Sequence, residues 1–323
     1  MTPHTLNQKR QAEHARQQRL KDRVYCCTVA GCLSAGADTV RTALQEQVDS
    51  QGAGQEIEVC GTGCMGLCSR GPLVRSSAQN IIYAEVKAED ARAILAGDGH
   101  LFDGRIFESD HPFFAGQRRI ILANSGKADP ERVIDYIAQG GYQSLLRAAT
   151  EMTPQEIIEE VKRSRLRGRG GAGYPTGLKW ELVARQPSSI RYVVCNADEG
   201  DPGAFMNRSV LEGDPHRVLE GMAIAGRAVG AQQGYIYVRG ESPLAIERIT
   251  KAIQQAQQEG LLGRSVFDSN FHFGIDLRIG AGAYVCGEET ALLASIQGKR
   301  GQPVPRPPYP TRKRFVEPSH AHQ

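Results

Sequence analysis

The cysteines of this chain are crowded into roughly its first fifth, and they constrain the fold of that part more than any other feature. Six of the 8 cysteines precede residue 69, and only Cys195 and Cys286 follow. The first 25 residues contain no apolar stretch of the kind that a secretory signal requires. Clustered cysteines without a secretory signal favour metal or redox chemistry over disulfides.

Two cysteine pairs have a spacing that suits an iron–sulfur cluster. Four residues separate Cys27 from Cys32 and three separate Cys64 from Cys68, whereas structural zinc sites usually contain C-x2-C pairs. Thiolates select either zinc or iron–sulfur clusters. Two longer-spaced pairs on two loops favour a small cluster. We therefore predict these four cysteines as its ligands, with a zinc-binding scaffold as the less favoured alternative.

Strand and helix patterns alternate between residues 24 and 99. Strands are expected over 24–27, 57–59, 73–75 and 81–86, and helices over 37–48 and 89–96. This β-α-β-β-β-α order suits a small thioredoxin-like α/β domain, with the ligand cysteines at exposed strand-to-loop edges. Cys26 and Cys60 lie within the strand patterns and are expected to be inert buried thiols.

The rest of the chain divides into four further segments. Residues 1–23 form a polar, basic arm and residues 100–150 a connector, while 312–323 resemble an unstructured tail. In 151–311, the capping box Thr153-Pro154-Gln155-Glu156 begins a helix. Strands expected over 192–195, 235–238 and 271–279 then alternate with helices over 215–230, 243–258 and 288–297. This alternation predicts a layered α/β domain with a parallel sheet.

A glycine-rich loop follows the capping-box helix. Residues 168, 170 and 173 form a G-x-G-x-x-G pattern, but a helix precedes it where the Rossmann fingerprint requires a strand. Its backbone N–H groups can hold phosphate, assisted by the charges of Arg169 and Lys179 and by a short helix near Leu178. The candidate cofactor-binding residues here are Gly168, Arg169, Gly170, Gly171, Ala172, Gly173, Tyr174, Pro175, Thr176, Gly177 and Lys179.

Two further segments follow predicted strands and complete a candidate nucleotide site. Residues 196–203 include three carboxylates, and ligand contacts in α/β proteins lie at the carboxyl ends of strands. These carboxylates can accept hydrogen bonds from ribityl or ribose hydroxyls. Residues 280–290 pass from small residues into the start of a helix, which again places a helix N-terminus beside a glycine-lined space. Three such loops exceed what one mononucleotide needs.

Composition excludes other classes of function. The net charge is only +3 and aromatic residues make up 6%, which argues against a nucleic-acid-binding surface. No apolar window approaches the length of a spanning helix, so direct membrane insertion is not expected.

These motifs resemble the NADH-binding flavoprotein subunits of complex I and the diaphorase subunits of NAD-reducing nickel–iron hydrogenases. The resemblance rests on residues 168–177, 196–203, 284–290 and 298–310 in this order, preceded by the cysteine domain. It implies FMN, NAD(H) and a 2Fe–2S cluster on Cys27, Cys32, Cys64 and Cys68. The fold implied is a thioredoxin-like ferredoxin domain followed by a layered α/β FMN/NADH-binding domain.

The resemblance also assigns roles to single residues. The implied FMN contacts are Lys179, Asn196, Asp198, Glu199, Tyr284, Gly287 and Glu288, together with the glycine loop. The implied NADH contacts are Gly171, Tyr174, Asp201, Glu289, Arg306 and Tyr309. Gly280 and Gly282 line the same space, and Lys179 and Glu289 are expected to tune the redox exchange as the catalytic pair.

The expected function is a diaphorase module that passes electrons reversibly from NADH through FMN to iron–sulfur clusters. Its expected partners are other hydrogenase or complex I subunits, and its expected location is the cytoplasm or the surface of a membrane. The family continues into a 4Fe–4S site, but Arg312-Lys313-Arg314-Phe315 departs from its pattern and no cysteine follows Cys286, so we expect a C-terminal truncation. The alternatives are a complex I subunit and a non-catalytic 2Fe–2S carrier or assembly fragment.

Overall fold

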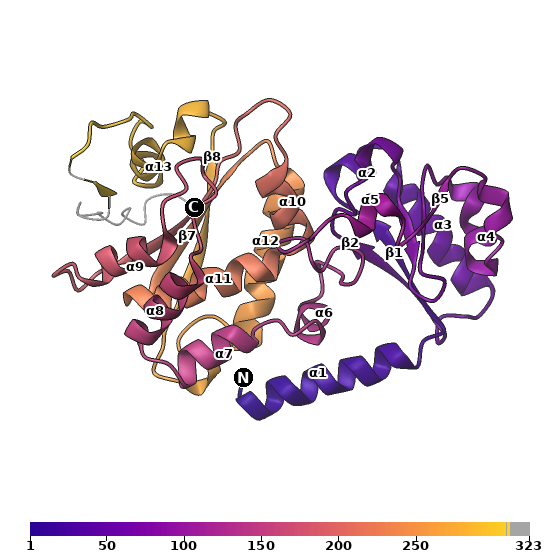
Figure 1. The fold of residues 1–323 in the computed structure, drawn as a ribbon, viewed down its shortest axis with the longest axis horizontal. Coiled ribbons are helices and arrows are strands. Elements are labelled where there is room, and N and C mark those ends of the chain that lie inside the picture. The colour runs from indigo at the N-terminus through magenta and orange to yellow at the C-terminus, as the bar shows by residue number, and fades with distance from the viewer. Residues whose placement is uncertain (308, 311–323) are drawn as a thin grey trace. The chain divides into compact units, whose positions relative to one another are not determined.

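The computed structural model describes residues 1–307, 309 and 310 and has a mixed α/β fold (Figure 1). The chain divides into two compact units. The N-terminal unit comprises His4–Gly141 and Ser209–His216, and the C-terminal unit comprises Met1–Pro3, Tyr142–Arg208 and the chain from Arg217 onward. The domain boundaries expected from the sequence remain predictions, and the expected tail, 312–323, lies outside the described residues.

The N-terminal unit is built on a five-stranded sheet of order β2-β1-β3-β4-β5. β1 and β2 are parallel, and the other neighbouring strands are antiparallel. The strands are β1 Asp22–Cys27, β2 Ile57–Thr62, β3 Val74–Ser76, β4 Ile81–Tyr83 and β5 Ile106–Glu108. The first four confirm the predicted strands. β5 lies in the expected connector and was not predicted, because its three residues are too few to form an alternating pattern.

Helices cover this sheet and extend the unit at its N-terminus. They are α1 Pro3–Gln18, α2 Ala30–Ser34, α3 Ala37–Ser50, α4 Ala91–Ala96, α5 Pro112–Ala115 and α6 Val133–Ala138, with short 3-10 helices η1 Cys68–Arg70, η2 Ala88–Asp90 and η3 Gly99–Phe102. Val40 and Leu44, one turn apart on α3, pack against Val24 of β1 in the main core. This contact explains why the helix predicted over 37–48 forms.

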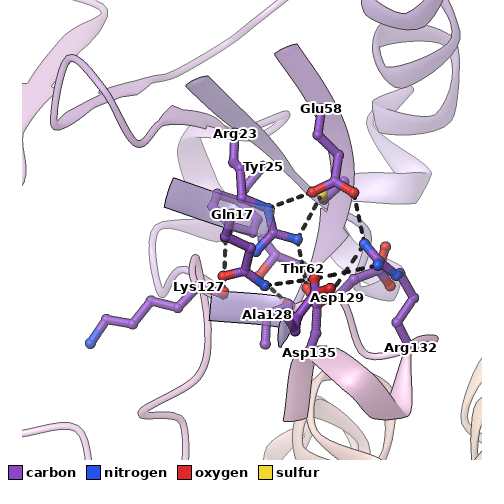
Figure 2. A network of polar contacts seen from close by, with 12 residues as sticks. Gln17, Arg23, Tyr25, Glu58, Thr62, Lys127, Ala128, Asp129, Arg132 and Asp135 are labelled. Atoms are coloured by element: carbon purple, nitrogen blue, oxygen red, sulfur yellow. Dashed lines mark hydrogen bonds and ion pairs between the residues drawn. The ribbon is translucent and has the colours of Figure 1, made fainter. Parts of the chain in front are cut away.

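A network of buried charges joins α1, β1, β2 and α6 in this unit (Figure 2). Arg23 lies 2.6 Å from Glu58 and 2.7 Å from Asp135, and it donates a hydrogen bond to the Tyr25 hydroxyl. Arg132 lies 2.8 Å from the same Glu58 carboxylate. Burial disfavours charge on Glu58, but the hydrogen bond from Arg16 and the charges of the nearby arginines lower its pKa to about 2.

The C-terminal unit contains a three-stranded parallel sheet of order β6-β7-β8, as the strand–helix alternation predicts. The strands are β6 Tyr192–Ala197, β7 Gln233–Arg239 and β8 Gly274–Gly280. Each predicted strand is therefore present with shifted ends. Because all three run in one direction, the loops that follow Ala197, Arg239 and Gly280 leave the same edge of the sheet.

Seven helices belong wholly or partly to this unit. They are α7 Gln143–Thr150, α8 Pro154–Ser164, α9 Thr176–Ala184, α10 Met206–Gly213, α11 Pro215–Val229, α12 Pro243–Gln258 and α13 Glu289–Ile296, with 3-10 helices η4 Val266–Asp268 and η5 Tyr284–Gly287. Leu292 and Ile296 of α13 pack against Tyr235 and Tyr237 of β7. The predicted capping box is confirmed, since Thr153 and Glu156 each accept a hydrogen bond from the other's backbone N–H.

Within the described residues, every helix is too short or too polar to cross a bilayer.

Candidate functional site

The four predicted ligand cysteines lie on one end of the N-terminal unit. Cys27 ends β1, Cys32 lies in α2, Cys64 follows β2 and Cys68 begins η1. Only Cys68 is exposed, so the expectation of an exposed set was wrong for the other three. The reason is that these three pack with Val29, Met65 and Leu73 in an apolar cluster of their own.

The four cysteines are arranged as two neighbouring pairs. The sulfur atoms of Cys64 and Cys68 are 3.6 Å apart. A hydrogen bond between the other two thiols lowers the pKa of Cys32 and raises that of Cys27, while burial raises the pKa of Cys64 to about 12. The pairs adjoin, because a Cβ on Gly71 would lie 3.0 Å from the Cys32 sulfur. In residues 1–307, 309 and 310, no three His, Cys, Asp or Glu side chains converge as a site for one metal ion.

Cys26 and Cys60 are buried, as predicted for the two cysteines left out of the ligand set. Cys26 points into the main core, whereas its neighbour Cys27 points to the other side of the strand. Cys60 accepts a hydrogen bond from Arg23 over 3.3 Å. Their environments are those of structural residues.

In the C-terminal unit, the glycine loop is a closed hairpin held by backbone hydrogen bonds. The N–H of Gly168 donates to the carbonyl of Tyr174 and that of Thr176 to Leu166, each over 2.9 Å. The loop tip, Arg169–Ala172, is exposed, and Cβ atoms on Gly170, Gly171 or Gly173 would meet nothing within 4 Å. The loop therefore presents open backbone, followed by the N-terminus of α9, which begins at Thr176 and not near Leu178.

Gly177 serves a different purpose from the other glycines of this loop. A Cβ at this position would lie 2.7 Å from the backbone N and 2.9 Å from the Cα of Lys162. Close packing of α9 on α8 therefore requires glycine here, and Gly177 is buried.

The acidic loop after β6 is tied to the segment after β8. The Asn196 amide donates to the Gly287 carbonyl over 2.9 Å, and the Tyr284 hydroxyl donates to Asp201 over 2.8 Å. The side chain of Asp198 is only 2% exposed, and its Oδ2 atom has no hydrogen-bond partner in the described structure. Burial raises the pKa of Asp198, although Arg239 opposes that rise.

Two of the predicted cofactor carboxylates act as helix caps. Glu199 accepts hydrogen bonds from the backbone N–H groups of Asn207 and Arg208 at the start of α10. Glu288 accepts from the N–H groups of Thr290 and Ala291 at the start of α13. Carboxylates in these positions offset the helix dipole and satisfy free amides. Any contact of either residue with a cofactor has to share a carboxylate that already accepts two hydrogen bonds.

Glu289 connects the glycine-loop helix with the segment that follows α13. Its carboxylate lies 2.5 Å from the guanidinium of Arg306 and 3.9 Å from the ammonium of Lys179. Around it, the side chains of Tyr174, Tyr284 and Tyr309 are 48%, 67% and 55% exposed. The predicted catalytic pair is thus brought together across α9 and α13, beside accessible aromatic rings.

Arg239 was missed by the sequence interpretation. It ends β7, and its guanidinium reaches both neighbouring loops, donating to Asp198 over 3.3 Å and to the Gly282 carbonyl over 2.9 Å. A lone arginine at a strand end carries no spacing signal, but it does occupy the one strand end of the parallel sheet to which we assigned no site residue.

The sequence of this unit matches a known domain. Residues 161–317 match the family model Complex1_51K, described as the Nuo51 FMN-binding domain. The NADP-reducing hydrogenase subunit HndC of Solidesulfovibrio fructosivorans is 56% identical over 201 residues, which are 62% of this chain and 41% of the relative.

Similarity to a second relative extends through the cysteine-bearing unit. The alpha subunit of the NAD-reducing hydrogenase HoxS of Cupriavidus necator is 33% identical over 308 residues, or 92% of this chain and 50% of the relative. A crystal structure of an NAD+-reducing NiFe hydrogenase in the H2-reduced state has a TM-score of 0.51 at 25% identity, covering 93% of this chain and 50% of that one. The chain therefore spans about half the length of the relatives it matches.

The class defined by the second unit is thus a flavin-binding α/β domain of the Nuo51 type. The chain as a whole is homologous to subunits of NAD(P)-reducing hydrogenases and of complex I.

Proposed function

We propose that this chain is the diaphorase module of a hydrogenase complex, which takes electrons from NADH and delivers them through FMN to iron–sulfur clusters. The observation that carries the proposal is the convergence of three loops at one edge of the parallel sheet. There the open glycine loop, the acidic loop and the start of α13 are linked by Asn196, Glu289 and Lys179.

The residues present fit a flavin mononucleotide. The exposed backbone of Gly170, Gly171 and Gly173 can approach a phosphate, and Lys179 adds positive charge at the same end. Asp198 offers an unpartnered oxygen to a ribityl hydroxyl. Bound FMN would accept hydride from NADH and hand on its two electrons singly to iron–sulfur acceptors. The protein's contribution is to bind both nucleotides, align them and limit access of water.

NADH is proposed to lie against the exposed aromatic side chains of Tyr174 and Tyr309. Stacking on such rings orients a planar base at little entropic cost. Glu289 and Arg306 would contact the polar part of the nucleotide, and the ammonium of Lys179 would favour negative charge that develops on the flavin during the exchange. This assignment predicts that Glu289 affects the handling of NADH rather than the binding of FMN.

The cysteine pairs fit a 2Fe–2S cluster with two thiolates on each iron. Two thiolates at about 2.3 Å from one tetrahedral metal lie about 3.8 Å apart. The 3.6 Å between the Cys64 and Cys68 sulfur atoms is close to that value. Gly66 and Gly71 leave space beside the thiols in which backbone N–H groups can face inorganic sulfide. The finer fold proposed for this unit is thioredoxin-like.

The hydrogenase context is supported by the extent of the similarity. The HoxS alpha subunit matches 92% of the chain, including the cysteine-bearing unit, and that protein is named an NAD-reducing hydrogenase. The proposed partners are accordingly NADH and further subunits of such a complex, with no direct contact with nucleic acid or lipid, in the cytoplasm.

Metal, flavin and activity analysis of the purified full chain tests this function. After reconstitution with FMN, iron and sulfide, we expect bound flavin, iron and sulfide equivalent to one 2Fe–2S cluster, and reduction of a viologen that depends on NADH. Iron without flavin, together with no NADH-dependent reduction, would overturn the diaphorase proposal and favour an electron carrier. Zinc without sulfide would overturn the cluster assignment.

A further inference from the structure

Arg239 contacts the loops that follow all three strands of the parallel sheet. Its Nη1 donates to Asp198 after β6, its Nε donates to Glu241 after β7 over 2.7 Å, and its Nη2 donates to the Gly282 carbonyl after β8. The side chain is only 12% exposed. These three loops are the ones proposed above to surround the nucleotide.

The shape of the guanidinium is required for this set of contacts. Its nitrogen atoms point in fixed, planar directions, whereas a lysine ammonium is a single point charge on a flexible stem. The acidic loop leaves room for it at Gly200, where a Cβ would lie 2.7 Å from Arg239 Nη1 and 2.8 Å from the ring of Tyr284. The loop and the arginine are therefore matched in shape.

Asp198 is left with one oxygen bound and one free. Its Oδ1 accepts from Arg239, while Oδ2 lies in a buried position without a partner in the described structure. A buried polar atom without a partner carries a cost in free energy that a ligand hydroxyl can remove. Arg239 thus orients a carboxylate so that its second oxygen is available to a donor.

We propose that Arg239 is the positioning residue of the nucleotide site, holding Asp198 and the Gly282 loop in the arrangement to which FMN binds. The inference rests on the proposed function, because the ligand is the flavin assigned there. Arg239 itself acts through Asp198 and through the loop, without taking part in the redox step.

Titration of FMN into the full chain, followed by quenching of flavin fluorescence, tests the proposal. Arg239→Gln is expected to raise the Kd for FMN at least about tenfold, the effect of losing a hydrogen bond to a charged group. Arg239→Lys should recover only part of the affinity. The matched control is Arg278→Gln, which removes an equal charge from β8 at a residue that pairs with Asp276 and packs over Tyr235, away from the loops.

A double variant separates positioning from general loosening of the fold. If Arg239 acts mainly through Asp198, Asp198→Asn combined with Arg239→Gln should weaken binding little more than the stronger single change. Fully additive losses, or wild-type affinity in Arg239→Gln, would overturn the inference. If Arg239→Gln does not fold by circular dichroism, wild-type affinity in Arg239→Lys overturns it instead. Failure of the unmodified chain to bind FMN would count against the proposed function itself.

Discussion

Arg23 Nη2 and Asp135 Oδ2 are 2.7 Å apart, and the two side chains are 5% and 0% exposed. The pair joins the first strand of the N-terminal unit to α6, 112 residues further along the chain. Such a contact closes the connector onto the sheet (Figure 2).

Replacing Arg23 by glutamine should destabilise the N-terminal unit by about 3 kcal/mol, because it leaves buried carboxylates without their cation. Urea unfolding monitored by circular dichroism measures the change. The control is Glu89→Gln, which removes an ion pair of 3.6 Å whose side chains are 71% and 76% exposed. That change should stay within about 0.5 kcal/mol. Equal effects of the two substitutions would contradict a special role for the buried network.

Acid should weaken the same unit through Glu58. The pKa of this carboxyl is about 2 in the folded chain, below its ordinary value of 4.5. A lowered pKa means that the ionised form stabilises the fold above pH 4.5, and that this contribution is lost as the pH falls from about 4.5 to 2. In Glu58→Gln, unfolding midpoints should be lower at pH 7 and should change less over this interval. A parallel loss of stability in both proteins would exclude Glu58 as the titrating group.

Removing a predicted cluster ligand should abolish the cluster, whereas removing a core cysteine should not. We expect Cys68→Ser to lose the visible absorption and the iron of the reconstituted chain. Cys60→Ser is the matched control, because Cys60 is equally close in sequence but hydrogen-bonds to Arg23 in the core. Full iron content in Cys68→Ser, with loss in Cys60→Ser, would reverse the assignment.

Glu289→Gln should change the handling of NADH and leave FMN binding intact. The substitution removes the negative charge that lies between Arg306 and Lys179. We expect a shift in KM for NADH or a fall in kcat of several-fold, measured by viologen reduction, with unchanged flavin content. Glu247→Gln, an exposed change on α12, serves as the control. Unchanged NADH oxidation and NADH affinity would show that Glu289 does not tune the exchange.

Two glycines of the same loop should respond differently to alanine. At Gly177 the added methyl would press against the backbone of Lys162, so we expect a loss of about 1–3 kcal/mol in the free energy of unfolding. At Gly170 nothing lies within 4 Å, and alanine should be neutral or slightly stabilising in the unliganded chain. FMN titration of Gly170→Ala then reports separately on close approach of a ligand. A stable Gly177→Ala would show that α8 and α9 can separate without cost.

Much of the fold was predictable from local patterns. The strands β6, β7 and β8 and the helices between them follow from apolar runs and their punctuation, and the capping box at Thr153 is a purely local signal. The cysteine pairs and the three loops were visible because their residues are close in sequence. β5 escaped because three residues carry no period, and it forms by pairing with β4.

The sequence by itself therefore determined which segments form the parallel sheet, which loops leave its carboxyl edge and which cysteines stand in pairs. Only the tertiary structure decided that three of the four paired cysteines are buried, that Glu199 and Glu288 cap helices, and that Arg239 joins three loops. The physical reason is that periodicity and spacing act over a few neighbouring residues. Burial and hydrogen bonding depend on groups such as Asp198 and Gly282, which the fold brings to Arg239 from distant parts of the chain.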